Sequence, residues 1–449
     1  MHQDFQNDAV STSLDKNKIG IFTATAIVVA NMIGTGVFTS LGFQVQAVQS
    51  VFPLLMLWLV GGVIALCGAL TYGELGAALP RSGGEYHLLT KIYHPALGFM
   101  SGWVSVTVGF AAPAALASIA LSKYLQAIFH GLPSQHVAAL AMLFFTVIHS
   151  IDIKFGSYSH NFFTVMKVAL ILVFVLAAFW MRAAEPISML PKRNDLPLFT
   201  SAGFAVSLIY VSFAYAGWNA AIYILGDIRD PRKNLPKALF LGTALVMVLY
   251  FLLNYVFLST VPMTELSGQI EVGYLSGTKI FGAVGGQIMA AVIAFLLLST
   301  VSGHVFVGPR IMQVMGEDYR ALHLLSLKSK NGIPVNGTVL QLFLTLILIY
   351  SSTFEQVMIY AGFTLNLITT LTVAGVIVLR MRDPALPRPY RTWGYPFTPF
   401  LFLLMSFWTL GFVMIDKPVE SSFGLGIVLL GVTIYVFNNH LVGKQNKLT

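Results

Sequence analysis

Apolar runs long enough to cross a bilayer recur along this chain of 449 residues. A hydrocarbon core about 30 Å thick needs roughly 20 apolar residues per helix. Within a helix, the backbone N–H and C=O groups bond to one another, so none is left without a partner in lipid. Hydrophobic residues form 56% of the chain and charged residues only 10%, which excludes a soluble protein of this length. The sequence predicts an all-α membrane protein with twelve transmembrane helices, at 19–44, 52–79, 95–127, 137–151, 158–182, 200–225, 236–260, 278–312, 338–352, 355–380, 396–415 and 422–440.

The order of the spans predicts two halves of five helices each, at 19–182 and 200–380. Because five is odd, the second half begins on the opposite side of the membrane, which makes the repeat inverted. The other predicted segments are a cytoplasmic tail at 1–18, an external loop at 183–199, a cytoplasmic loop with two further helices at 381–440, and a cytoplasmic tail at 441–449.

Positive charge fixes the predicted orientation. With both termini in the cytoplasm, most of the 26 lysines and arginines lie on that side, as the positive-inside rule requires. These side chains are expected to contact phospholipid headgroups of a cell membrane rather than nucleic acid. Glu74, near the cytoplasmic end of the second span, is expected to pair with Arg81 or another cytoplasmic arginine.

The residue patterns of enzymes and metal sites are not found in the sequence. Cys67 is the single cysteine, which excludes a disulfide framework or a cysteine metal site within the chain. No Ser-His-Asp pattern, HExxH motif or phosphate-binding glycine loop is visible. His149 and His304 are isolated imidazoles, so packing is expected for both. We predict no enzyme activity, no cofactor and no metal.

Two spans are interrupted by residues that disfavour a continuous helix. Gly34-Thr35-Gly36 lies within the first span, and the segment 213–219, with Gly217, lies within the sixth. Two glycines alone usually indicate close helix packing. Broken helices in corresponding positions of two halves, however, indicate the binding site of a transporter, where freed backbone groups face a protein-lined cavity.

The two breaks offer complementary backbone groups. A half-helix beginning at about Thr35 presents N–H groups and a positive dipole end to a carboxylate, while unpaired carbonyls around Phe213 and Ala214, and those of Met32 and Ile33, suit an ammonium group. We therefore expect the backbone to hold an α-amino acid, with its side chain in an apolar space under Phe213. Ordinary aromatic packing is the alternative for the gate residues. The predicted substrate-binding residues are Met32, Ile33, Gly34, Thr35, Gly36, Phe213, Ala214, Ala216 and Gly217, and the predicted gate is Phe213 with Trp218.

Lys167 is an ionisable residue near the middle of the fifth span, which makes it a functional candidate. Its ammonium group would replace a bound sodium ion beside the first break, or carry a proton, because burial lowers the proton affinity of a lysine. We favour the fixed cation. The hydroxyl groups expected beside it belong to Ser299, Thr300 and Ser302 of the eighth span.

Five motifs occur in order along nearly the whole chain. They are IGTGVF at 33–38, PRSGGEY at 80–86, FAYAGWN at 213–219, DPRKNLP at 230–236 and PRPYR at 387–391. With these motifs the chain resembles the amino acid-polyamine-organocation family, and more narrowly its L-type amino acid transporter branch. The resemblance implies a leucine-transporter type of inverted repeat, alternating access and α-amino acid substrates.

The resemblance also implies roles for individual residues. It implies carboxylate binding by Thr35 and Gly36, gating by Phe213, and a lysine in a sodium position at Lys167. The chain departs from the family pattern at Gly226, where relatives commonly have an acidic residue, and at Ser302 and His304 in the eighth span. The loop between the third and fourth spans has no cysteine, so no disulfide-linked heavy chain is expected.

These observations predict a sodium-independent transporter of neutral L-amino acids that works by exchange or facilitated movement. The absence of acidic residues near either break argues against cationic side chains. Proton-coupled symport within the same family is one alternative. A nutrient sensor without transport activity, or a channel, is an alternative of another class.

Overall fold

The computed structural model describes residues 18–151, 155–181, 187 and 190–445. The predicted tails 1–18 and 441–449 and the predicted loop 183–199 therefore lie partly outside the described residues. Helices account for most of the described chain, and the β contact found there is an isolated bridge between Ile19 and Ile228. The predicted all-α fold class is confirmed.

The first half of the chain places two short helices after the first break and divides the third span by a π-helical segment. Its helices are α2 (Ile21–Met32), α3 (Gly36–Thr39), α4 (Leu41–Ala47), α5 (Val51–Ala78), α6 (Gly84–Ile92), α7 (Pro95–Val104), the π-helix η1 (Ser105–Phe110), α8 (Ala111–Gln126), α9 (Ser134–Ile151) and α10 (Phe155–Trp180).

The second half contains the longest helix, α15, which extends beyond both ends of the predicted span 278–312 and is kinked at Gly282. Its elements are η2 (Arg193–Thr200), α11 (Ala202–Tyr215), α12 (Ala220–Tyr223), η3 (Leu225–Asp227), α13 (Pro231–Thr260), α14 (Met263–Leu266), α15 (Val272–Asp318), η4 (Arg320–Ser326), α16 (Val335–Ser351), α17 (Phe354–Arg382), α18 (Phe397–Asp416) and α19 (Pro418–Gln445).

Ten helical stretches of the described part are long and apolar enough to cross a membrane, when α2 is counted with α3 and α7 with η1 and α8. The helix α11 reaches that length only together with η2, to which it is bent by 69°, and α16 is apolar but has 17 residues. The α11 helix is short because the chain leaves helical geometry at Ala216. The count of twelve spans therefore stays a prediction.

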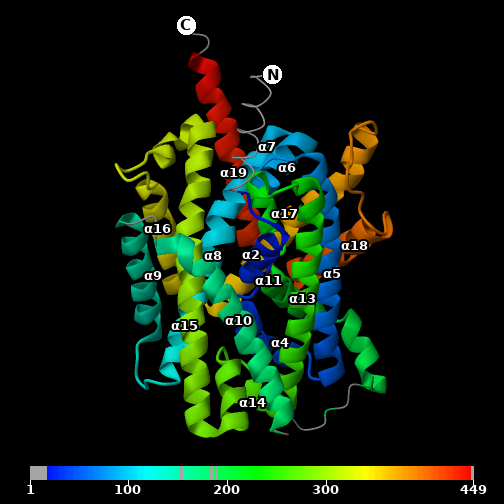
Figure 1. The fold of residues 1–449 in the computed structure, drawn as a ribbon, viewed down its shortest axis with the longest axis vertical. Helices are drawn as coiled ribbons and strands as arrows, with labels where there is room; N and C mark the ends of the chain where they lie inside the picture. Colours follow the sequence, from blue (N-terminus) through cyan, green and yellow to red (C-terminus); the bar gives the residue numbers. More distant parts are fainter. Residues whose placement is uncertain (1–17, 152–154, 182–186, 188–189, 446–449) are drawn as a thin grey trace, which may run out of the picture.

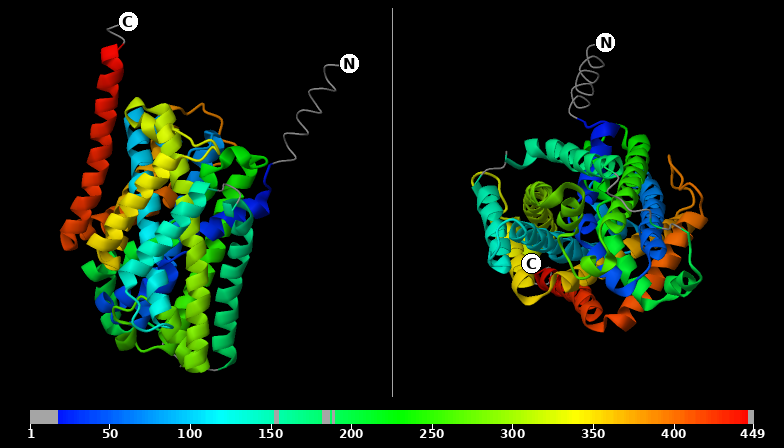
Figure 2. Two further views of the ribbon diagram at one scale, coloured as in Figure 1. Left: turned by 90° about the vertical axis from the view of Figure 1, so that its left-hand side faces the viewer. Right: turned by 90° about the horizontal axis from the view of Figure 1, so that it is seen from below.

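The broken helices occupy the middle of the bundle. Figure 1 shows α2 and α11 among the long helices α5, α13 and α15, and Figure 2 shows α19 at the edge of the molecule. Burial follows this arrangement, because 56% of the most apolar stretch within 21–39, which contains the first break, is buried but only 22% of that in α19. The lipid-facing helices are therefore at the rim, and the interrupted helices are enclosed by protein.

The isolated bridge joins the segments that lead into α2 and out of η3. The Ile19 amide donates to the Asp227 carbonyl at 2.8 Å, and the Arg229 amide donates to the Ile19 carbonyl at 2.9 Å. The ends of the two interrupted spans that carry α2 and α12 are thus linked through the backbone.

Candidate functional site

The first break lies between Met32, where α2 ends, and Gly36, where α3 begins. Ile33 leaves helical geometry with a ψ of 86°. Within the described chain, the amides of Gly34, Thr35 and Gly36 donate to no backbone carbonyl, although the Gly34 amide has the Tyr250 hydroxyl oxygen as a partner. The break thus provides N–H donors of the kind that bind anions at a helix N-terminus.

The second break follows Tyr215, the last residue of α11, and requires a glycine. Ala216 is extended, and Gly217 has a φ of +103°, which residues with a side chain rarely adopt. A Cβ atom at Gly217 would also lie 2.7 Å from the carbonyl oxygen of Asn31, so the break packs against α2. The Phe213 carbonyl accepts a bond from the Ala216 amide at 3.0 Å, and the expectation that this carbonyl is free is therefore wrong.

Tyr250 of α13 links the two breaks. Its hydroxyl lies 2.5 Å from the carbonyl oxygen of Met32 and 3.2 Å from that of Ala214. The phenol ring packs beside Trp58 and Tyr215, with ring centroids 5.6 and 5.1 Å away. Two of the carbonyl groups predicted to receive an ammonium group therefore converge on one point. Sequence reasoning missed Tyr250, because it is one aromatic residue within an ordinary apolar run.

The half-helices α3 and α11 are packed tightly against each other. A Cβ atom at Gly36 would lie 2.6 Å from the Cα atom of Ala214, and all residues from 35 to 45 are buried. Tyr124 of α8 holds this half in place by donating to the Phe38 carbonyl at 2.9 Å. On the other side of the break, the side chain of Asn31 is exposed. The site is thus closed on the side of α3 and α11.

Both predicted gate residues are buried. Phe213 is 8% exposed and Trp218 is 6% exposed. The Trp218 ring meets the Tyr72 ring edge to face, with centroids 4.6 Å apart, and a Cβ atom at Gly68 would lie 2.8 Å from it. Trp218 therefore packs on the wall formed by α5. The gating role of both residues stays a prediction.

Lys167 of α10 is buried and reaches one of its three predicted hydroxyl partners. Its Nζ donates to Thr300 Oγ1 at 3.2 Å, and the Thr300 methyl group lies 3.9 Å from the position of a Cβ at Gly34. Ser302 Oγ instead lies 2.9 Å from His149 Nε2, and no hydrogen bond joins Ser299 to Lys167 among the described residues. The lysine is thus one side chain away from the first break.

The π-helix η1 interrupts the third span on the face next to α15. Phe110, its last residue, lies with its ring centroid 6.1 Å from that of His304, whose Nδ1 is 2.8 Å from the Thr300 carbonyl. Since the acceptor there is a carbonyl, Nδ1 carries the proton. Single π turns are frequent at functional sites. The sequence contained no signal for this segment, because its residues are compatible with a regular α-helix.

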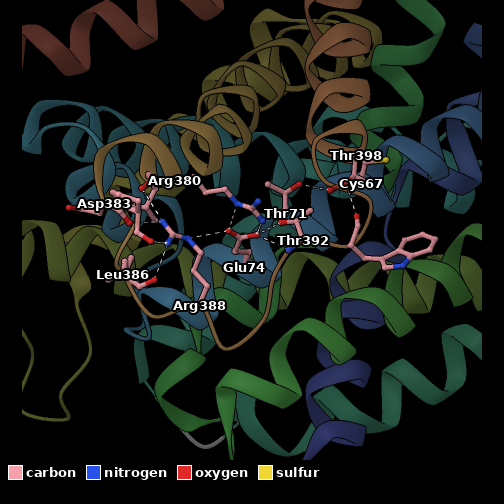
Figure 3. Close-up of polar contacts among 12 residues, drawn as sticks. Cys67, Thr71, Glu74, Arg380, Asp383, Leu386, Arg388, Thr392 and Thr398 are labelled. Atoms are coloured by element: carbon pink, nitrogen blue, oxygen red, sulfur yellow. Dashed lines mark hydrogen bonds and ion pairs between the residues drawn. The ribbon is translucent and has the colours of Figure 1, made fainter.

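Glu74 anchors the loop between α17 and α18, as Figure 3 shows. Arg380 donates to its carboxylate from Nε at 2.8 Å and from Nη2 at 2.6 Å, and Thr392 donates from its amide and its hydroxyl at 2.6 and 2.7 Å. Arg388 lies 3.5 Å away. The expected pairing of Glu74 with an arginine is confirmed, with Arg380 and Arg388 rather than Arg81, and the cytoplasmic position of these arginines stays a prediction. Because its acceptor oxygens are occupied by these donors, Glu74 is a structural anchor.

The described residues offer little to a metal ion. They contain no group of three or more His, Cys, Asp or Glu side chains that would hold one. Cys67 is buried within α5 as a free thiol. The chemistry of the site therefore depends on backbone groups, hydroxyl groups and the ammonium group of Lys167.

Comparison with known proteins shows similarity over nearly the whole chain. Residues 19–437 match the family model described as amino acid permease. The large neutral amino acids transporter small subunit 2 of Rattus norvegicus is 30% identical over 431 residues, which cover 94% of this chain and 80% of that protein. The same transporter of Homo sapiens is also 30% identical, with the same coverage. The b(0,+)-type amino acid transporter 1 of Homo sapiens is 29% identical, covering 98% of this chain and 91% of that protein.

Proposed function

Since this chain belongs to the amino acid permease family, we propose that it carries neutral L-amino acids across the cell membrane by alternating access, without sodium. Transport proceeds by exchange or by facilitated movement. The observation that carries this proposal is the meeting of two broken helices at the hydroxyl of Tyr250, where the first break offers N–H donors and both helix ends offer carbonyl acceptors.

The substrate is an α-amino acid because the site offers opposite partners for its two charged groups. The amides of Gly34, Thr35 and Gly36 receive the carboxylate, supported by the dipole of the half-helix that follows. The carbonyls of Met32 and Ala214 receive the ammonium group, since a carbonyl oxygen accepts two hydrogen bonds and Tyr250 uses one.

Sodium independence is supported by the position of Lys167. Its ammonium group lies beside Thr300 and, across the Thr300 side chain, beside the first break. A fixed cation there supplies the positive charge that a bound sodium ion would otherwise supply. A buried lysine also carries a proton in some proteins, so the alternative of proton symport is tested together with sodium dependence.

We propose that the ends carrying α2 and α12 face the cytoplasm. The bridge between Ile19 and Ile228 puts these ends together, and the basic residues near them follow the positive-inside rule. The names of two relatives include the words small subunit. Because the only cysteine, Cys67, is buried in α5, any partner subunit of this chain would associate without a disulfide bond.

Efflux of a preloaded amino acid from proteoliposomes tests the proposal. Vesicles loaded with labelled leucine or alanine are diluted into buffer that contains single unlabelled amino acids, with and without sodium and with and without a pH gradient. We expect external neutral amino acids to stimulate efflux, equally with and without sodium. Efflux into empty buffer at the same rate indicates facilitated movement. A requirement for a pH gradient indicates proton symport, and ohmic currents without saturable efflux indicate a channel.

A further inference from the structure

Glu85 of α6 is a buried carboxylate whose hydrogen-bond donors are neutral. It is 3% exposed and accepts hydrogen bonds from the Tyr72 hydroxyl at 3.1 Å, the side-chain NH₂ group of Asn219 and the Tyr223 hydroxyl. Within the described residues, no lysine or arginine forms a salt bridge with it. A buried carboxylate without a counter-ion needs its hydrogen bonds, so Glu85 and its donors hold one another in place.

Two of these donors belong to the second break. Asn219 lies two residues after Gly217, and Tyr223 ends α12. Gly84 has a φ of +58°, and a Cβ atom added there would lie 2.3 Å from the Tyr223 ring. The start of α6 therefore packs directly against α12. The neighbouring loop adds a further bond, from the Gly226 amide to the Ser82 hydroxyl at 2.8 Å.

The next residue of α6 points to a different helix. The Tyr86 hydroxyl donates to Asp318 Oδ2 at 2.6 Å, and Asp318 is the last residue of α15, the helix that carries Thr300. Burial and the hydrogen bond to Asp318 raise the pKa of Tyr86 above its usual value, so Tyr86 remains a neutral donor. Adjacent residues of one short helix thus hold the second break and the end of α15.

We propose that α6 positions the second break of the substrate site. Glu85 fixes Asn219 and Tyr223, and Tyr86 fixes α6 itself against the end of α15. This inference rests on the proposed function, because it assigns α6 to the site through which the substrate passes. Glu85 acts as a positioning residue, through the segment 216–219, and neither contacts the substrate nor carries a proton.

The substitutions Glu85→Ala and Glu85→Gln separate positioning from proton transfer. Glutamine keeps the geometry, because its oxygen accepts from Tyr72 and Asn219 while its NH₂ group donates to the Tyr223 oxygen. We expect E85A to raise the KM of exchange about tenfold, and E85Q to raise it no more than about threefold. The matched control is Glu265→Ala, at an exposed glutamate paired with Lys279. Equal loss in E85Q and E85A, or a normal KM in E85A, overturns the proposal.

A second measurement does not depend on substrate. Cys67 is the only cysteine, so Cys67→Ala gives a background in which Ala216→Cys is the single thiol, at a half-buried position in the break. We expect E85A and Tyr86→Phe each to change the rate of maleimide labelling at position 216 severalfold. Tyr86→Phe removes one hydroxyl and serves if E85A does not fold. Unchanged rates in the variants that fold overturn the proposal. Changed rates in a protein that moves no amino acid would leave the positioning in place and reject the proposed function.

Discussion

Tyr250 donates its hydroxyl hydrogen to the carbonyl oxygen of Met32 across 2.5 Å, so a side chain of α13 satisfies the end of α2. The same hydroxyl is 3.2 Å from the Ala214 carbonyl, where α11 ends. One phenol group therefore sets the separation between the carbonyls that we assign to the substrate ammonium group.

The substitution Tyr250→Phe should weaken substrate binding. Phenylalanine keeps the ring between Trp58 and Tyr215 but removes the hydroxyl that donates to Met32 and lies beside the Ala214 carbonyl. We expect the KM to rise about tenfold, the size of one lost hydrogen bond in a buried site. The control is Tyr255→Phe on the same helix, whose ring stacks on Phe179. An unchanged KM in Y250F would separate Tyr250 from the substrate site.

The substitution Lys167→Ala should abolish transport, because it removes the cation beside Thr300 and the first break. We expect exchange to fall by at least about a hundredfold, because an ionisable group buried within a membrane span is kept for its function. Lys279→Ala, at an exposed ion pair, is the control and should exchange normally. Full activity of K167A would remove this residue from the mechanism. Activity that returns only with sodium would support the role of a fixed cation.

The substitution Gly36→Ala should prevent α3 from closing on α11. The added methyl group would lie 2.6 Å from the Cα atom of Ala214, and a backbone atom cannot move away at low cost. We expect a loss of about 2 kcal/mol in stability together with a strong loss of exchange. Gly411→Ala is the matched control, because a Cβ there meets open space. Intact substrate binding in a variant with a bulkier residue at position 36 would refute the assignment of the carboxylate to this break.

The substitution Glu74→Gln should destabilise the fold rather than alter substrate preference. It leaves Arg380 and Arg388 without their anion where Glu74 is 1% exposed. Breaking such a buried pair costs about 3 kcal/mol. Thermal unfolding in detergent measures the effect. The control is Glu265→Gln at the exposed pair with Lys279, which should lower the free energy of unfolding by less than about 1 kcal/mol. A melting temperature like that of the wild type would contradict the anchoring role.

His87 should make the protein less stable in acid. Burial, aided by Arg81 and Lys91, lowers the pKa of His87 from 6.5 to about 4. The unfolded chain therefore binds the proton first, and this histidine weakens the fold progressively as the pH falls from 6.5 towards 4. We expect the melting temperature of His87→Gln to fall less over this range than that of the wild type. The exposed His323, replaced by glutamine, is the control; equal pH dependence of H87Q and wild type would contradict the prediction.

The sequence predicted both breaks because each contains a glycine where a helix would otherwise continue, at Gly34, Gly36 and Gly217. It could not predict Tyr250 as the link between them, because that contact depends on how α13 packs. The sequence also could not predict which arginine pairs with Glu74, since Arg380 lies 306 residues away. Local patterns therefore predict where a helix ends but not which distant side chain satisfies the end.

The three hydroxyl groups proposed beside Lys167 show where sequence reasoning could have gone further. Thr300 and Ser302 are two residues apart, so on an α-helix they point in nearly opposite directions, about 200° apart. Only one of them can face Lys167, and the structure places Thr300 there while Ser302 contacts His149. Helical geometry would have excluded the pair, but it would not have identified which member faces the lysine.

The backbone bridge between Ile19 and Ile228 couples the segment that precedes α2 to the segment that follows η3. A displacement of either segment also displaces the other through these hydrogen bonds, so the first and sixth spans move together at this end. A rigid fusion partner joined just ahead of residue 18 would therefore load the sixth span as well as the first.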